Sequence, residues 1–213
     1  MSGGPTRYRD RREAGRALAR HLREYAGDDS VTVLGLPRGG VVVAFEVARA
    51  LGAPLDVLVP RKIGAPGNAE YAIGAITDDG EAVWNEAEHG RADPRYLKRA
   101  VEAEHAEAQR RLAAYRGDRP PLTLIGRTAV LVDDGVATGL TMRAAIRSAR
   151  QKGAARVVVA VPHGAPDALL ALAREADSLV AIDRPLWYGS VGQYYEDFPQ
   201  VDDATVVSLL SDA

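Results

Sequence analysis

The chain of 213 residues contains no cysteine, which excludes disulfides, thiolate catalysis and cysteine-ligated metals. It has no apolar run near the ~20 residues that a membrane span needs. Neither sign of charge is in excess, because 27 Lys and Arg residues stand against 29 Asp and Glu residues and the net charge is −2. A broad basic surface for nucleic acid is therefore not expected, although a local pocket can still attract an anionic small molecule. The polar stretch from Met1 to Arg12 lacks the apolar core of a signal peptide, so a cytoplasmic location is expected.

Two common nucleotide-binding motifs are also absent. No glycine-rich run ends in Gly-Lys-Ser/Thr, as a P-loop requires, and residues 35–40 do not fit the G-x-G-x-x-G of a dinucleotide site. The histidines show no metal-ligand spacing, and three of them are expected to be exposed: His21, His89 and His105.

Apolar strands alternate with amphipathic helices along most of the chain. Runs rich in Val, Leu and Ile predict strands at residues 31–36, 55–59, 128–132, 156–161 and 179–182. Helical spacing predicts helices over residues 8–26, 42–51, 94–115, 141–152, 166–175 and 202–210. Because the strands are apolar throughout and helices join them, we expect an α/β fold with a five-stranded parallel sheet covered by helices on both faces.

The section between the second and third of these strands is less regular. Residues 64–67, Gly-Ala-Pro-Gly, predict a mobile loop, and residues 72–77 and 81–84 predict a hairpin around Asp78-Asp79-Gly80. The long helix after it is expected to pack on the body of the protein or on a second subunit, so a homodimer stays open. We expect a single domain over residues 1–213, with a core at about 28–184, an insertion at about 61–127 and a hood at about 185–213.

The most informative stretch runs from Ala129 to Met142. An apolar strand ends in two adjacent carboxylates, Asp133 and Asp134, and small and hydroxylated residues then lead into a helix. Ligands bind at the carboxyl edge of an open parallel sheet. Glycines let backbone N–H groups converge on an anion, and the start of the helix adds roughly half a positive charge. The stretch therefore offers carboxylates for hydroxyl groups or a metal beside a cradle for a phosphate, and a sugar phosphate needs both.

This stretch resembles the signature of the type I phosphoribosyltransferases: four apolar residues, two acidic residues and a Thr/Gly-rich loop that opens a helix. The resemblance implies the fold of that family and Mg²⁺-dependent transfer of a phosphoribosyl group from 5-phosphoribosyl-1-diphosphate to a nucleobase or related nitrogen acceptor, with release of diphosphate. It assigns Asp133 and Asp134 to the ribose hydroxyls. The loop residues that it assigns to the 5′-phosphate are Gly135, Ala137, Thr138, Gly139 and Thr141.

Two further segments follow the order of the same family. Leu36-Pro37-Arg38-Gly39-Gly40 resembles its diphosphate loop, in which the glycines permit a close approach and Arg38 supplies a cation. Family members hold a cis peptide before that cation, here the bond between Pro37 and Arg38. Residues 60–64 resemble the adenine-type enzymes, in which an Arg-Lys pair opens the flexible catalytic loop, so Lys62 or Arg61 is expected to reach the diphosphate when that loop closes.

The C-terminal segment from Pro185 to Phe198 resembles the small hood of the hypoxanthine-type enzymes. The resemblance implies that Tyr188 or Trp187 stacks on the base and that Val191 contacts it. It also places Glu196 or Asp197 near a second magnesium ion, so the candidate metal ligands are Asp133, Asp134 and Glu196.

The departures from the family leave the acceptor open. Ala137 stands where hypoxanthine-type enzymes carry an Asp general base, and Pro162-His163 stands where a Lys reads a 6-oxo purine. His163 is expected to cap the helix that begins at Pro166, with contact to a base as the alternative. A sensor or regulator that binds phosphoribosyl diphosphate or a nucleotide without turnover is the alternative function, and an enzyme acting on a non-nucleobase amine is another.

Overall fold

A five-stranded parallel sheet forms the centre of the computed structural model, which describes residues 7–213 except the side chains of residues 69, 70 and 86. The strand order is β2-β1-β6-β7-β8, and every neighbouring pair is parallel. All five strands lie where the apolar runs predict them. Their bounds are β1 (Val31–Gly35), β2 (Leu55–Val57), β6 (Thr128–Val132), β7 (Arg156–His163) and β8 (Ser178–Asp183).

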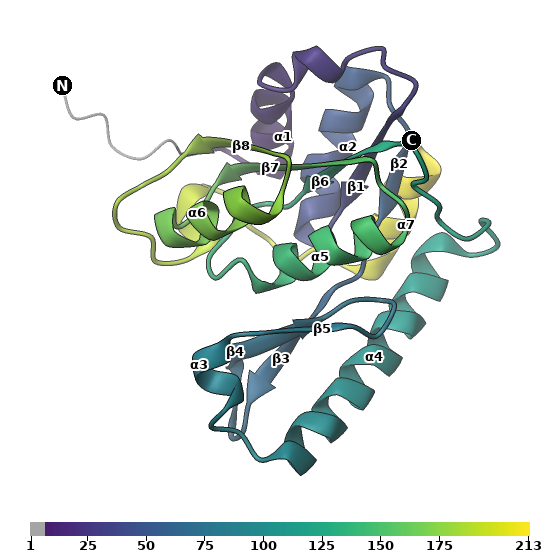
Figure 1. The fold of residues 1–213 in the computed structure, drawn as a ribbon. Coiled ribbons are helices and arrows are strands. Elements are labelled where there is room, and N and C mark those ends of the chain that lie inside the picture. Colours follow the sequence, from purple (N-terminus) through teal and green to yellow (C-terminus); the bar gives the residue numbers. More distant parts are fainter. Residues whose placement is uncertain (1–6) are drawn as a thin grey trace.

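Helices cover both faces of this sheet, as predicted (Figure 1). Successive residues of a strand point to opposite faces, so Val33 and Val130 pack on one side while Leu34 and Leu131 pack on the other. The first side is covered by α1 (Arg11–Arg20) and α2 (Gly39–Leu51), and the second by α5 (Leu140–Gln151) and α6 (Pro166–Glu175). The predicted first helix is shorter than expected, because it ends at Arg20 and a separate turn, η1 (Arg23–Tyr25), follows.

A second, antiparallel sheet lies beside the carboxyl edge of the first. Its strands are β3 (Arg61–Ala65), β4 (Asn68–Ile76) and β5 (Ala82–Trp84), and α3 (Glu86–His89) and α4 (Pro94–Arg116) follow them. The predicted hairpin around residues 78–80 is confirmed. Its tip is bound to the C-terminal end of α5, since the ammonium of Lys152, the C-cap residue, lies 3.1 Å from the Asp78 carboxylate and 2.6 Å from that of Asp79.

The prediction of a mobile loop over residues 64–67 is wrong in its bounds. Gly64 and Ala65 belong to β3 and pair with β4, and only Pro66 and Gly67 lie in the turn between the strands. The pairing is interrupted by register shifts on either side of Gly64. The glycines and the proline are typical of a loop, so the local sequence does not predict this strand. The strand is defined by its pairing with β4. Ile63 anchors the small sheet against Leu97 of α4.

The start of the described chain pairs with residues 194–196, well before the C-terminus. The Tyr8 N–H donates to the Tyr194 carbonyl at 2.8 Å, and the Glu196 N–H donates to the Tyr8 carbonyl at 2.8 Å. The short helix η2 (Val191–Tyr194) therefore forms a small hood together with the N-terminal segment. The last helix, α7 (Asp203–Ser211), packs through Val206 into the core that α2 and α4 share. Among residues 7–213, no helix is both long and apolar enough to cross a membrane.

Candidate active site at the carboxyl edge of the sheet

The acidic pair stands directly after β6, at the carboxyl edge of the sheet. The Asp133 Oδ1 atom accepts a hydrogen bond from the Asp134 N–H at 2.8 Å, which orients the first carboxylate. Burial raises the pKa of Asp133 well above its usual value, and the neighbouring Asp134 carboxylate raises it further. Burial also raises the pKa of Asp134, against the opposing charge of Arg11. The pair therefore favours a ligand that brings hydroxyl donors or a cation.

Arg11, at the start of α1, is the residue that sequence reasoning missed. Its Nε atom lies 2.8 Å from Asp134 Oδ2, and the two side chains are only 10% and 13% exposed. The hydroxyl of Tyr195 donates to the Asp134 carbonyl at 2.6 Å from the hood side. No local sequence pattern predicts the contacts of Arg11 and Tyr195 with Asp134, because these partners are 123 and 61 residues apart in the sequence.

The Pro37-Gly40 loop packs closely against the acidic pair. A Cβ atom on Gly40 would lie 2.7 Å from Asp133 Oδ1, and one on Gly39 would overlap the Asp134 carboxylate. The peptide bond between Pro37 and Arg38 is cis, as predicted. The glycines are thus required by contact with the protein's own carboxylates, in addition to any approach of a diphosphate. The Arg38 guanidinium lies 3.7 Å from Asp203 of α7.

Gly40→Ala is expected to destabilise the protein by about 1–3 kcal/mol, the usual cost of forcing extra volume into a packed site. Its methyl group would meet both the Asp133 carboxylate and the Val132 carbonyl, 2.9 Å away. Urea unfolding of the variant measures the loss. An unchanged free energy of unfolding would mean that this contact is loose.

The predicted phosphate loop lies between the acidic pair and α5. Gly139 is the N-cap residue of α5 with φ at 78°, a conformation that favours glycine. A cavity of about 370 Å³ opens over the loop and the acidic pair. The predicted site residues that line it are Lys62, Asp133, Asp134, Gly135, Ala137, Thr138, Gly139, Thr141 and Val191.

A second cavity of about 390 Å³ adjoins the first, and Lys62 and Thr141 line both. Arg61 lines this second cavity. Its guanidinium is paired with an acid there, since the Nε atom lies 2.9 Å from Glu104 Oε2 on α4. Lys62 is exposed, and no ion pair joins its ammonium to any carboxylate in the described part of the chain. The two adjacent cations therefore differ, because one is held back by an acid and the other faces both cavities.

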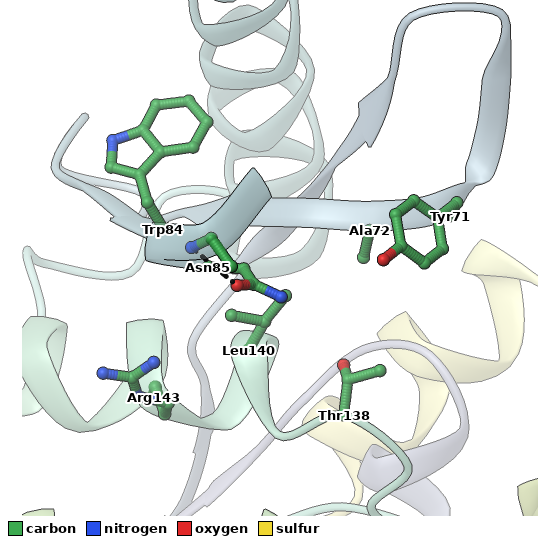
Figure 2. A pocket seen from close by; sticks show the side chains of 8 residues that line it. Tyr71, Ala72, Trp84, Asn85, Thr138, Leu140 and Arg143 are labelled. Carbon is green, nitrogen blue, oxygen red and sulfur yellow. Dashed lines mark hydrogen bonds between the residues drawn. The ribbon is translucent and has the colours of Figure 1, made fainter. Parts of the chain in front are cut away.

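A third cavity, of about 460 Å³, lies between the small sheet and the start of α5, and the sequence did not indicate it. Figure 2 shows Trp84 and Arg143 toward one end and Tyr71 and Thr138 toward the other. Tyr71 and Thr138 also line the cavity over the acidic pair, so the two spaces are neighbours. The Arg143 Nε atom is bound to Glu175 Oε1 at 2.6 Å.

Comparison with known proteins decides the family. The model of the phosphoribosyl transferase domain family matches residues 7–199. The chain belongs to this family. Two Mycobacterium tuberculosis proteins, "Putative phosphoribosyl transferase MT0597" and "Putative phosphoribosyl transferase Rv0571c", are each 46% identical to it over 206 residues, 96% of this chain. The chain spans about half the length of these relatives, 46% in each case. The crystal structure of TT1426 from Thermus thermophilus is 47% identical with a TM-score of 0.81, covering 97% of this chain and 99% of that one.

Of the hood residues predicted to contact the acceptor in this phosphoribosyl transferase domain, only some line the cavity over the acidic pair. Val191 lines the cavity over the acidic pair, whereas the half-buried Tyr188 stacks on Tyr194 with 5.1 Å between ring centroids. Trp187 is 91% exposed. Glu196 is exposed, and within residues 7–213 no three His, Asp or Glu side chains form a group that could hold a metal. The structure thus leaves Glu196 outside any such group with the acidic pair.

His163 does not cap α6, and that prediction is wrong. The N-cap residue of α6 is Ala165, and no side chain bonds its first turn. His163 instead lies fully buried in the hood, where its Nδ1 atom is 2.9 Å from the Tyr188 hydroxyl and its ring stacks on Tyr194. The return of the C-terminal segment creates this cluster, so nothing beside His163 in the sequence indicates it. Of the other histidines, two are exposed as predicted and one, His105, is half-buried.

The stability of the domain is expected to fall as the pH falls from about 6.5 to about 4. Burial lowers the pKa of His163 to about 4, while an unfolded histidine titrates near 6.5. In that window the unfolded chain binds the proton and the folded chain does not, so acid favours unfolding. Urea unfolding across the window should show a shallower pH slope in His163→Gln. The exposed control, His21→Gln, should keep the wild-type slope, and equal slopes in all three proteins would refute the assignment.

Proposed function

We propose that this domain binds 5-phosphoribosyl-1-diphosphate with Mg²⁺ and transfers its phosphoribosyl group to a nucleobase or related nitrogen acceptor, releasing diphosphate. The observation that carries the proposal is one cavity that combines a carboxylate pair, a glycine-rich loop at a helix N-terminus and the Lys62 ammonium. These are the groups that a ribose, a 5′-phosphate and a leaving diphosphate each require. Family membership supports the same function.

The acidic pair and the loop would hold the sugar. Asp133 and Asp134 would accept hydrogen bonds from the ribose hydroxyls, and the backbone of residues 135–139 with the Thr141 hydroxyl would surround the 5′-phosphate. Carboxylate oxygens are ligands that Mg²⁺ prefers, and the raised pKa values of the pair fit a site that accepts further positive charge. Bound Mg²⁺ supplies charge neutralisation to the diphosphate.

The chemistry assigned to the chain is positioning and electrostatic stabilisation. The bond from the ribose anomeric carbon to the diphosphate oxygen breaks, the acceptor nitrogen forms the new bond, and the transition state has oxocarbenium character. The diphosphate gains negative charge as it leaves, and Lys62, which lines both cavities, would stabilise that charge. Ala137 offers no carboxylate base, so the acceptor would bring its own nucleophilic nitrogen.

A specific observation favours the sensor as second candidate. Of the three cations expected on the diphosphate, Arg61 is paired with Glu104 at 2.9 Å and Arg38 lies 3.7 Å from Asp203. In each pair the carboxylate competes with the diphosphate for the cation. A protein that only binds the activated sugar needs the acidic pair and the loop, and neither depends on these two cations.

Two measurements on the full chain test the proposal. Calorimetry with 5-phosphoribosyl-1-diphosphate should show binding that depends on Mg²⁺, and a panel of nucleobases and amines should then release diphosphate. Absence of binding would reject the function altogether. Binding without release by any acceptor would select the sensor.

A further inference from the structure

Arg11 is a buried cation that binds one carboxylate of the proposed site. Arg11 is only 8% exposed, and an arginine this buried normally has a partner for its charge. The Nε atom donates to Asp134 Oδ2 at 2.8 Å. The family motif at residues 130–142 contains Asp134 but says nothing of Arg11, which lies in another part of the sequence.

The backbone that carries Arg11 is held firmly. Arg11 begins α1, and the Asp10 side chain caps that helix by accepting from the Glu13 N–H at 2.8 Å. The helix packs closely on α2, because a Cβ atom on Gly15 would lie 2.7 Å from the Val43 carbonyl oxygen. A rigid helix start is what lets a long side chain hold a carboxylate in one place.

The same guanidinium also contacts Phe198 and Pro199 in the C-terminal segment. Its Nη1 atom donates to the Pro199 carbonyl at 2.8 Å, and its Cζ atom lies 3.7 Å from the centre of the Phe198 ring. Phe198 stacks in turn on Tyr195, whose hydroxyl donates to the Asp134 carbonyl. Arg11 therefore joins the first helix, the acidic pair and the C-terminal segment.

We propose that Arg11 is a positioning residue that fixes the Asp134 carboxylate for the ribose, an inference that rests on the proposed function. The guanidinium binds Oδ2, so a ribose hydroxyl would bind through Oδ1. It also offsets the repulsion between two neighbouring half-buried carboxylates, which would otherwise be relieved by protonation or by rotation away from each other. The planar fork binds Asp134 and Pro199 together through donors at fixed positions, whereas a lysine presents one compact charge without that spacing.

The test uses Arg11→Gln, Arg11→Lys and a matched control, Arg12→Gln. Arg12 follows Arg11 on the same helix, and its Nη1 atom pairs with Glu46 at 2.9 Å, outside all three cavities. Calorimetry with 5-phosphoribosyl-1-diphosphate and Mg²⁺ is expected to show at least a tenfold loss of affinity in Arg11→Gln and a three- to tenfold loss in Arg11→Lys. Arg12→Gln should stay within twofold of wild type.

A double-mutant cycle with Asp134→Asn separates positioning from a general loss of structure. In the Asp134→Asn background, Arg11→Gln should change affinity by less than threefold, because the carboxylate on which it acts is gone. Losses that multiply would overturn the proposal, and so would tighter binding in Arg11→Gln, which would make Arg11 a competitor of the ligand. Should Arg11→Gln not fold, wild-type affinity in Arg11→Lys would overturn it. Failure of the wild-type protein to bind would instead reject the proposed function.

Discussion

Replacing Asp133 and Asp134 together by Asn is expected to weaken Mg²⁺-dependent binding of 5-phosphoribosyl-1-diphosphate at least a hundredfold, about 2.7 kcal/mol. Each carboxylate is assigned a charge-assisted hydrogen bond to a ribose hydroxyl, and such bonds contribute roughly 1.5–3 kcal/mol each. The Asn side chain has nearly the same shape, so the loss reports charge. Isothermal calorimetry of the double variant measures it, and wild-type affinity would remove the central assignment.

The two single variants should differ in stability. Burial and the neighbouring acid raise the pKa of Asp133, so Asp133→Asn removes an unfavourable charge and is expected to leave stability unchanged or slightly higher. Asp134→Asn leaves Arg11 without its carboxylate and should lower the stability. The stability of the fold is therefore expected to depend on Asp134, although the acidic pair lies at a strand end.

A matched control for Asp134 lies in the same sheet. Asp56 of β2 is 9% exposed and is bound by Arg116 of α4 at 2.9 Å, and it lines none of the three cavities. Asp56→Asn should lower the stability as Asp134→Asn does, but it should leave ligand affinity within twofold of wild type. Equal losses of affinity in both variants would mean that binding responds to stability alone.

The sequence predicts those features whose causes are local. The five core strands are apolar runs, and the order of apolar strand, acidic pair and Thr/Gly-rich loop in residues 129–142 carries its own chemistry. The strand at residues 61–65 was missed because it is polar and contains glycine, and only its pairing with β4 defines it. Its hydrophobic signal consists of one buried residue, Ile63.

The features that the sequence does not predict depend on distant segments. Arg11 lies among several arginines of an amphipathic helix, and nothing in that pattern distinguishes the one that reaches Asp134. His163 directly precedes a helix start, which made a cap reasonable, yet residues 188–195 return to enclose it. Long-range contacts of this kind join residues that share no periodicity, so local pattern alone cannot select them.

Lys62→Ala is expected to lower the catalytic rate by about 10²- to 10³-fold while changing the affinity for 5-phosphoribosyl-1-diphosphate by less than about threefold. Charge on the departing diphosphate develops in the transition state, so a cation placed for that charge contributes to the rate more than to binding. Lys62 suits this role better than Arg61, because Glu104 holds Arg61 while Lys62 is exposed and lines both cavities.

Single-turnover kinetics and calorimetry on the same preparation measure the two effects of Lys62→Ala. Lys98→Ala is the matched control, since Lys98 is an exposed lysine of α4 that lines none of the three cavities. The control should leave rate and affinity at the wild-type values. A loss of rate and affinity in equal proportion would make Lys62 a uniform binding residue and end its catalytic assignment. Tight binding of the sugar with no diphosphate release in any variant, wild type included, would leave Lys62 without a leaving group to stabilise and would favour the sensor.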